Sequence, residues 1–514
     1  MRKIKIISKM VIVILYITIM SGCTPRIVSN KVVNENSVDD FKDYSNENIE
    51  NDDYEKIVTP SDEKVTLKIV DWSDSTKIRR EEFNEKFMKE NPNITIEYTT
   101  LTEEQFKETI VSGMKSGNAP DLFPLPQSIK LSTAVSEGWF IPMNKYASNG
   151  FFNTFEDGGL NEGITNINNQ TYILPESASM INTLMFYNKE VLRLAGFTED
   201  NLPKTWSEFI HISSEISKIG KGDYYGIITS GAQTNRLELE IRSFASLAGA
   251  KCGESGQILL ENGENQLNSK GMKKAFALYE SLVDSGSFHP DSTLLKAPEA
   301  RALFANNEAA FIIQGAWCIS EWRKQNKDLD FGVMQLPVPD EGINGKLPYV
   351  SSKGWMGISS TCKNPDIAMK YLEGLFSIEY QSKLVEDGGF VSIIKNVNEL
   401  YMKDTVMKDY YEIHKAQAAL VPDPLILDIN TSLVYEEVKD ITPTLGDIVQ
   451  GTLASAINYK EELYDLYEKT QKEWRRAINE VNSLNKVINE KSFEFSNWDN
   501  MKNYSIEDYK EKGE

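Results

Sequence analysis

The stretch from Ser116 to Gln127 reads SGNAPDLFPLPQ and brings a helix end, a carboxylate and a short apolar strand together. A segment with helical periodicity, residues 103–115, ends at Ser116-Gly117. Leu122-Phe123 then reads as a strand that the following prolines cut short. A strand that stops abruptly beside polar groups is typical of the binding edge of an α/β sheet.

The chain before Pro124 alternates between strand and helix patterns. In order, these are a strand at 65–70, a helix with Ile78, Phe83 and Phe87 on one face, a strand at 94–98, the helix at 103–115, and Leu122-Phe123. This order predicts a parallel sheet covered by helices. Ligands bind at the carboxyl ends of strands in such sheets, which points to Trp72 and to the residues after Phe123.

Similar patterns continue along the chain. Further strands are predicted at 170–175, 183–188, 309–313, 331–337 and 356–359, and an amphipathic helix at 365–385. Thr205 and Glu208 form a capping box that predicts a helix start. The apolar stripe at 456–487 is short for a coiled coil, so we expect it to pack against the body.

Composition narrows the classes of function. The chain has 514 residues, 40% of them hydrophobic, and a formal net charge of −21. This length predicts two or more domains with a real core. The acidic balance and the lack of a Lys/Arg-rich face argue against nucleic-acid binding. They favour a neutral or cationic small molecule over an anionic one.

The N-terminus has the pattern of a secretion signal. Basic residues precede an apolar run at 10–20, and Met20-Ser-Gly-Cys23 resembles a bacterial lipobox. The run is shorter than the roughly 20 residues that span a membrane. We therefore expect a lipoprotein signal peptide at 1–22 and acyl chains, palmitate among them, on Cys23. The alternatives are an ordinary signal peptide or an uncleaved anchor.

Residues 23–64 are rich in Asn, Asp and Glu, and they predict an acidic disordered tether between the anchor and the folded body. The remaining cysteines, Cys252, Cys318 and Cys362, have no metal or redox spacing. Packed thiols are expected there, although whether any pair forms a disulfide stays open.

The sequence contains no recognisable arrangement of catalytic residues. The three histidines are far apart, and no zinc, phosphate-loop or nucleophile-elbow motif occurs. With 76 acidic residues, carboxylate pairs are too common to indicate a glycosidase. The sequence therefore predicts a protein that is not an enzyme, with no catalytic residues, no cofactor and no metal.

Many short motifs, read in order, resemble one family: the extracellular solute-binding lipoproteins of bacterial ABC importers, of the carbohydrate type (family 1). These motifs are the lipobox, LKIVDW at 67–72, NPNITIE at 91–97, MKSGNAPDLF at 114–123, EGWFIPMN at 137–144, TYILP at 171–175, PKTWSEF at 203–209, QGAW at 314–317, GVMQLP at 332–337, KGW at 353–355 and NPDIAMKYL at 364–372. The resemblance covers roughly residues 65–485, and the end of the chain is similar to a tail found in some Gram-positive members.

The resemblance implies an α/β fold: a two-lobed, periplasmic-binding-protein-like clamshell with a ligand cleft between the lobes. The solute-binding domain is expected over residues 65–490. Lobe 1 would comprise about 65–180 and 330–390, lobe 2 about 181–329 and 391–490, and 491–514 would be a C-terminal tail.

Sugar sites combine flat aromatic rings with hydrogen-bonding groups. Trp72, Trp317 and Trp355 follow or adjoin predicted strand ends and are the candidate aromatic plates. Each could instead be a packed core residue.

Asp121, Gln127 and Glu176 are the candidate hydrogen-bonding residues, because each lies beside a predicted strand and a proline. Asp121 could equally cap its turn, and the other two could be structural.

The expected function is that of a monomeric receptor on the extracellular face of the cell membrane. It would be anchored through Cys23, would capture a sugar or oligosaccharide by hinge closure and would deliver it to the permease subunits of an ABC transporter. The alternatives are a surface-tethered glycan-active enzyme and a ligand-presenting subunit of a signalling system. The solute itself stays open.

Overall fold

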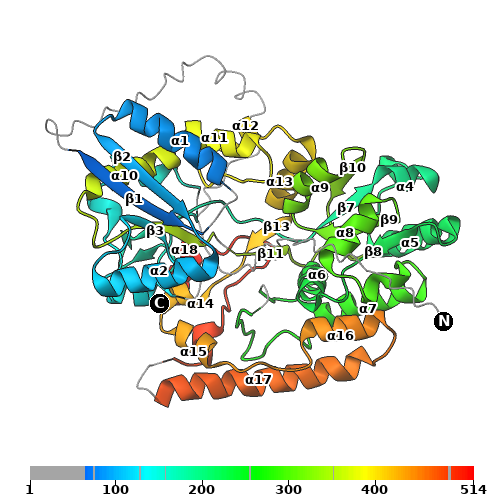
Figure 1. The fold of residues 1–514 in the computed structure, drawn as a ribbon. Coiled ribbons are helices and arrows are strands. Elements are labelled where there is room, and N and C mark those ends of the chain that lie inside the picture. The colour runs from blue at the N-terminus through cyan, green and yellow to red at the C-terminus, as the bar shows by residue number, and fades with distance from the viewer. Residues whose placement is uncertain are drawn as a thin grey trace, which may run out of the picture.

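The computed structural model describes residues 64–72, 76–126, 129–156, 158–253, 256–350, 352–483 and 488–513. The chain forms two separate main sheets, each covered by helices, and the α/β two-lobed prediction is confirmed (Figure 1). The predicted signal peptide and nearly all of the predicted tether lie outside the described residues.

The first sheet has the order β2-β1-β3-β12-β6. Its strands are β1 (Val65–Asp71), β2 (Ile94–Thr100), β3 (Leu122–Pro124), β6 (Ile173–Pro175) and β12 (Gly354–Ile358). β1 runs parallel to β2 and β3, whereas β12 is antiparallel to both β3 and β6. The carboxyl ends of β1, β3 and β6 therefore meet the amino end of β12 at one edge of the sheet.

Helices cover both faces of this sheet. On one face, Leu67 and Ile69 pack with α1 (Lys77–Glu90), α10 (Pro365–Leu375) and α11 (Ile378–Glu386). On the other, Phe123 packs with α2 (Glu103–Ser116) and α3 (Leu131–Ser136). These elements confirm the strand-and-helix order predicted for the first 60 or so residues of the body.

Two details of the helix predictions are wrong. Ile78 does not lie on the inner face of α1 but is 73% exposed, and Arg80 is buried there together with Asn84 and Phe87. The single helix expected at 365–385 is two helices, because Ser377 caps the start of α11 by accepting a hydrogen bond from the backbone of Tyr380.

The second sheet has the order β10-β7-β9-β8. Its strands are β7 (Leu184–Asn188), β8 (Tyr225–Ile228), β9 (Ala309–Gln314) and β10 (Phe331–Met334). Around it lie α4 (Lys189–Leu194), α5 (Trp206–Gly220), α6 (Thr234–Leu247), α7 (Lys270–Asp284), α8 (Ala297–Ala305), α9 (Trp317–Gln325) and α13 (Thr405–Gln417). The capping box of Thr205 and Glu208 starts α5, as predicted.

β10 corrects one lobe boundary. The resemblance implies that residues 330–390 belong to lobe 1, but β10 pairs with β7 in the second sheet. The chain therefore crosses between the sheets after Met334. The start of the expected second segment of lobe 2, 391–490, is also wrong, because Ile394 bridges Phe155 and α12 (Val397–Tyr401) packs against α11 of the first lobe. The other bounds stay a prediction.

A short parallel ladder lies between the two sheets in Figure 1. It consists of β11 (Leu347–Tyr349) and β13 (Ala418–Leu420). The remaining elements are the β4–β5 hairpin (Asn166–Ile167, Gln170–Thr171), α12 (Val397–Tyr401), α14 (Pro424–Leu427), α15 (Thr431–Glu437), α16 (Leu445–Leu453), α17 (Tyr459–Ser483) and α18 (Ile506–Gly513). In α17 the apolar stripe is buried at Leu463, Leu466 and Ile478, so its predicted packing against the body is confirmed.

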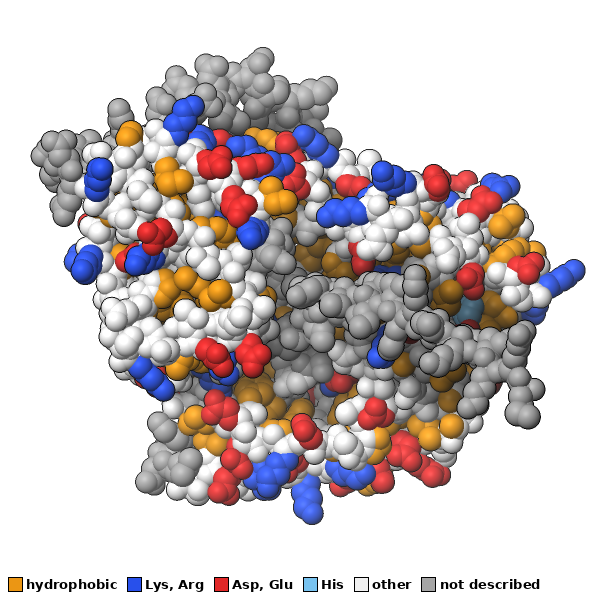
Figure 2. Space-filling view, in the orientation of Figure 1, with side chains coloured by type: hydrophobic (Ala, Val, Ile, Leu, Met, Phe, Trp, Pro, Cys, Tyr) orange, Lys and Arg blue, Asp and Glu red, His pale blue; other side chains and the backbone are white. Residues whose placement is uncertain are grey.

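The distribution of surface charge and the burial of the cysteine thiols match what the sequence predicts. Acidic and basic side chains are interspersed over the face shown in Figure 2, with no dominant basic patch. Cys252 and Cys318 are buried free thiols, and Cys362 is a half-buried one. None of the described helices combines the length and apolar content that a membrane crossing requires.

α6 carries a buried carboxylate, Glu240, in the second lobe. Thr229 donates to it at 3.1 Å and the Tyr279 hydroxyl donates at 2.8 Å. Burial raises the pKa of Glu240 to about 7, although Arg236 and the two hydrogen bonds lower it.

We expect Glu240→Gln to remove a pH-dependent loss of stability. Between the ordinary pKa of a glutamate and about 7, only the folded state keeps the proton, so the parent loses stability as the pH rises through this window. The free energy of unfolding of the variant relative to the parent should therefore rise from pH 5 to pH 8, by up to about 3 kcal/mol. Urea unfolding at both pH values tests this, and Glu280→Gln on the exposed face of α7 is the control that should show no such change.

Candidate ligand-binding site

Four predicted or neighbouring positions meet at one edge of the first sheet. Trp72 follows β1, Leu125 follows β3 and Glu176 follows β6. Trp355 lies near the amino end of β12, and its carbonyl oxygen accepts a hydrogen bond from the Leu125 amide at 2.9 Å. The strand order thus gathers Trp72, Glu176 and Trp355 at the kind of sheet edge where α/β proteins bind ligands.

A buried arginine joins two carboxylates at this edge. Arg80, on α1, is 1% exposed and pairs with Asp71, the last residue of β1. Its second terminal nitrogen lies 3.2 Å from Glu176 Oε1 and also donates to Thr76 at 2.8 Å. Thr76 in turn donates to the same Glu176 oxygen at 3.0 Å. The edge therefore carries a connected Asp71–Arg80–Glu176 network, with one more carboxylate than cation.

The same guanidinium orients an aromatic ring. The carbon at the centre of the Arg80 guanidinium lies 4.5 Å from the centroid of the Trp355 ring and 5.7 Å from that of Tyr98. Such stacking is favourable because the aromatic face carries negative charge density. Trp355 is only 7% exposed, and no described group accepts a hydrogen bond from its buried indole N–H. The Trp355 side chain is therefore largely part of the packed wall.

Glu176 is the most accessible charged group of the network, with 23% of its side chain exposed. Burial raises its pKa, whereas the nearby Arg80 charge and the Thr76 hydrogen bond lower it. The carboxylate is thus held in place by two donors and still reaches the surface.

Trp72 is half-buried beside this network. Its backbone N–H donates to Asp71 Oδ1 at 2.7 Å, and its side chain packs against the cluster that contains Phe123 and Phe140. Of the two tryptophans at this edge, Trp72 keeps the larger exposed fraction, because Trp355 is nearly buried.

A second aromatic–arginine pair lies at the edge of the second sheet. Trp317 begins α9 just after β9, is 37% exposed and stacks on Arg236 of α6 at 5.3 Å. Arg236 donates to the Asn182 carbonyl at 3.0 Å. Within the described residues, the buried polar atoms Arg236 Nε, Ser230 Oγ and Gln314 Nε2 have no hydrogen-bond partner.

One predicted residue does not join these groups, and another lies outside the described residues. Asp121 precedes β3, at the opposite end of the strand from Leu125, and its carboxylate accepts from the Lys68 amide at 2.8 Å. That contact matches the structural alternative for Asp121. Gln127 lies outside the described residues, so its role stays a prediction.

Sequence reasoning missed Asp71, Thr76, Arg80 and Arg236. A signal for Arg80 existed, because Arg80, Asn84 and Phe87 share the spacing of one helix face, but a charged residue on an inner face is normally read as solvent-exposed. Among the described residues, no group of three or more His, Cys, Asp and Glu could hold a metal ion.

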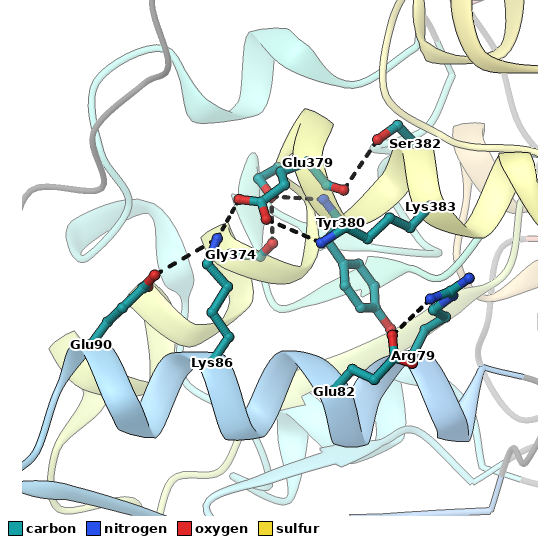
Figure 3. A network of polar contacts seen from close by, with 10 residues as sticks. Arg79, Glu82, Lys86, Glu90, Gly374, Glu379, Tyr380, Ser382 and Lys383 are labelled. Carbon is teal, nitrogen blue, oxygen red and sulfur yellow. Dashed lines mark hydrogen bonds and ion pairs between the residues drawn. The ribbon is translucent and has the colours of Figure 1, made fainter.

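A shallow pocket lies elsewhere, between α1 and α11. It is lined by Arg79, Lys86, Glu379 and Tyr380 among others. Lys86 of α1 pairs with Glu379 of α11 (Figure 3), and Arg79 pairs with Asp387, directly after α11. These bridges hold α1 against α11 and so help to fix the position of Arg80, one residue away from Arg79.

Curated relatives match most of the chain at low identity. A Brucella abortus (strain 2308) protein known by name only as a binding protein is 24% identical over 382 residues, which cover 74% of this chain and 86% of the relative. The multiple sugar-binding protein of Streptococcus mutans serotype c is 22% identical over 342 residues, covering 66% of this chain and 77% of that protein.

A solved structure supports the architecture. The sugar-binding protein MalE from Xanthomonas citri aligns with a TM-score of 0.57 at 17% identity and covers 81% of this chain and 99% of its own. At this identity the match concerns the fold, and it agrees with the two-sheet arrangement described above.

The family model for bacterial extracellular solute-binding proteins matches residues 72–382, more than half of the chain. This range includes the edges of both sheets, with Arg80, Glu176, Arg236, Trp317 and Trp355. The chain belongs to the family of bacterial extracellular solute-binding proteins.

Proposed function

We propose that this protein is a lipid-anchored receptor that captures a sugar or oligosaccharide between its two lobes and delivers it to the permease of an ABC importer. One observation carries the proposal: a half-buried aromatic ring, Trp72, and a partly exposed, donor-held carboxylate, Glu176, lie at the same edge of the first sheet. A sugar presents flat C–H faces and hydroxyl donors, and these two groups suit both.

The second sheet edge would complete the site. Trp317 offers a second partly exposed ring, and Arg236 beside it is a hydrogen-bond donor. We propose that hinge closure brings the Trp72–Glu176 wall and the Trp317–Arg236 wall onto opposite sides of one ligand. Ser230 and Gln314, whose buried polar atoms have no partner among the described residues, would then gain contacts to ligand or water.

A neutral solute fits the first wall better than a phosphate. Asp71 and Glu176 together outweigh the single charge of Arg80, so an anion would approach a net negative group. Hydroxyl groups can donate to the Glu176 carboxylate without this repulsion. The name of the Streptococcus mutans relative, a multiple sugar-binding protein, points to the same class of ligand.

The membrane arrangement rests on the sequence. Cys23 of the lipobox would carry the acyl chains, and residues 23–64 would let the folded body stand off the extracellular face. We propose a monomer of the carbohydrate-import class without catalytic residues. An enzyme or a signalling subunit gains no support from a specific contact in the structure.

A thermal-shift screen of the full chain in detergent micelles tests the proposal. The panel would contain maltose, maltotetraose, raffinose, a chitin oligosaccharide, spermidine and glycerol 3-phosphate, each followed by mass analysis of the recovered ligand. A ligand at 100 times its Kd stabilises by about 2.7 kcal/mol, which gives a clear shift. A shift with an unchanged saccharide supports the receptor. Turnover of the sugar, or a shift with glycerol 3-phosphate alone, would contradict it.

We expect Trp72→Ala and Glu176→Gln to weaken binding of the saccharide found in that screen. Loss of the stacking ring should cost roughly 1 kcal/mol, about fivefold in Kd. Loss of the charged acceptor should cost about 1.5–3 kcal/mol, or at least tenfold. Calorimetric titration measures both.

The matched control is Tyr464→Ala, which removes a 52% exposed aromatic side chain on α17. It should leave Kd unchanged. Trp355→Ala is less informative, because truncating a 7% exposed tryptophan also destabilises the wall. Parent-like affinity in both Trp72→Ala and Glu176→Gln would refute the placement of the site.

The affinity should also depend on pH. Because burial raises the pKa of Glu176, this carboxylate takes up its proton at a higher pH than an ordinary glutamate. Protonation removes the charged acceptor, so we expect Kd to increase as the pH is lowered towards and through the raised pKa of Glu176. Glu176→Gln should flatten this profile, whereas Glu280→Gln, on the exposed face of α7, should keep it. A parent whose Kd stays constant down to about pH 4, below the ordinary pKa of a glutamate, would rule out Glu176 as the acceptor.

A further inference from the structure

The C-terminal segment 488–513 is packed into the molecule, although only a tail is predicted for residues 491–514. Its aromatic side chains Phe495, Trp498, Tyr504 and Tyr509 are all at least 94% buried. They form a separate apolar cluster with four residues from elsewhere in the chain: Leu259, Val350, Leu420 and Val421. A segment that buries this much apolar surface resists detachment.

Three backbone groups at the β11–β13 ladder bind this segment. The Tyr504 amide donates to the Leu420 carbonyl, and the Leu420 amide donates to Asn503 Oδ1, each at 2.9 Å. The Lys346 amide, just before β11, donates to the Asn500 carbonyl at 2.9 Å. Both strands of the ladder are thus tied to the C-terminal segment.

The ladder lies where the chain crosses between the sheets. β11 belongs to the connection between β10 of the second sheet and β12 of the first. β13 directly follows α13, which packs against β10. Beyond β13, α15 reaches the first lobe, where Glu436 pairs with Lys130 at 2.7 Å.

α13 connects the ladder with the other crossing segment, between β6 and β7. The Tyr410 hydroxyl donates to the Ile181 carbonyl at 2.6 Å. The His414 ring lies edge-on to Tyr349 of β11, with ring centroids 4.7 Å apart. A change of angle between the lobes must therefore move α13, β11 and β13, which the C-terminal segment holds.

The segment is also anchored before and after the residues that contact the ladder. On the N-terminal side, the Phe493 carbonyl accepts a hydrogen bond from the Leu260 amide, in the loop between α6 and α7 of the second lobe. On the C-terminal side, the Tyr509 hydroxyl on α18 accepts from the Asp423 amide at 2.5 Å, at the start of α14. In Figure 1 the red end of the chain passes β11 and β13 and ends at α18.

We propose that residues 488–513 act as a brace on the hinge, which limits how far and how freely the two lobes open and close. The inference rests on the proposed function in one respect, because hinge closure is what the brace would restrict. The brace adds a constraint on lobe motion that lies away from the ligand-contacting groups Trp72, Glu176 and Trp317.

Spin-label distance measurements between the lobes test the brace without any ligand. The labels would be placed at Glu104→Cys on α2 and Lys273→Cys on α7, both exposed, in the full chain with Cys23→Ser and Cys362→Ser. Cys252 and Cys318 are buried and can stay.

The loosened chain carries Asn503→Ala and Tyr509→Phe, which remove two tethers but keep the aromatic packing. Asn503→Asp retains an acceptor for Leu420, and Lys502→Ala changes a 78% exposed neighbour. We expect a broader interlobe distance distribution in the loosened chain and a parent-like one in both controls. A loosened chain that melts cooperatively and has a distribution as narrow as the parent's would overturn the brace.

If the loosened chain does not fold, Tyr509→Phe alone supplies the same comparison, because it removes only one hydroxyl. Adding the saccharide panel of the thermal-shift screen to the labelled parent is a separate arm. Interlobe distances that stay constant with every panel member would count against ligand-driven closure, and so against the proposed function. The widths of the distance distributions measured without ligand would still show whether the brace restricts lobe motion.

Discussion

The buried ion pair of Arg80 with Asp71 is the constraint around which the first lobe is built. A guanidinium that is 1% exposed loses its hydration and is tolerated only with opposite charge and hydrogen-bond acceptors around it. The Asp71 carboxylate, at the end of β1, and the Glu176 carboxylate, just after β6, supply this charge and these acceptors. In the sheet, β1 and β6 lie on opposite sides of β3 and β12. Removing Asp71 would leave the Arg80 guanidinium without its fully buried partner, with only the more exposed Glu176 carboxylate to offset its charge. The network therefore fixes α1, the strand ends and the Trp355 ring relative to one another.

Topology decides which side chains can join such an edge. β12 runs antiparallel to β3 and β6, so Trp355, near its beginning, meets residues that follow the ends of the other strands. The same principle acts in the second sheet, where Trp317 follows β9, and Asn182, the acceptor of Arg236, precedes the antiparallel β7. In each lobe an aromatic ring is stacked on an arginine from a helix. A ring held in this way keeps its orientation, and in the proposed site this would reduce the entropy lost on binding.

Much of this fold could be predicted from the sequence, because the alternating apolar positions of β1 and the capping box of α5 are local signals. The site could be predicted only in part. Trp72 and Glu176 follow recognisable strands, whereas Arg80 and Arg236 lie in helices where a charged residue normally faces solvent. Their burial depends on partners about ten to a hundred residues away, which no local pattern encodes. Asp121 failed to join the edge for a related reason: it lies beside the strand in sequence but at its opposite end in space.

The balance of charge at the two edges bears on which solutes the fold can accept. Two unit charges about 5 Å apart interact by about 3 kcal/mol at an effective dielectric constant of about 20. The single positive charge of Arg80 offsets only part of the negative charge around Glu176. A phosphate beside Glu176 would therefore meet a repulsion of that order, whereas an uncharged hydroxyl would not. In the second lobe, Arg236 lies near Glu240, whose pKa of about 7 leaves its charge dependent on pH. The same two-lobed scaffold could serve many ligands, so in the proposed site these local charges, more than the fold itself, would set the class of solute.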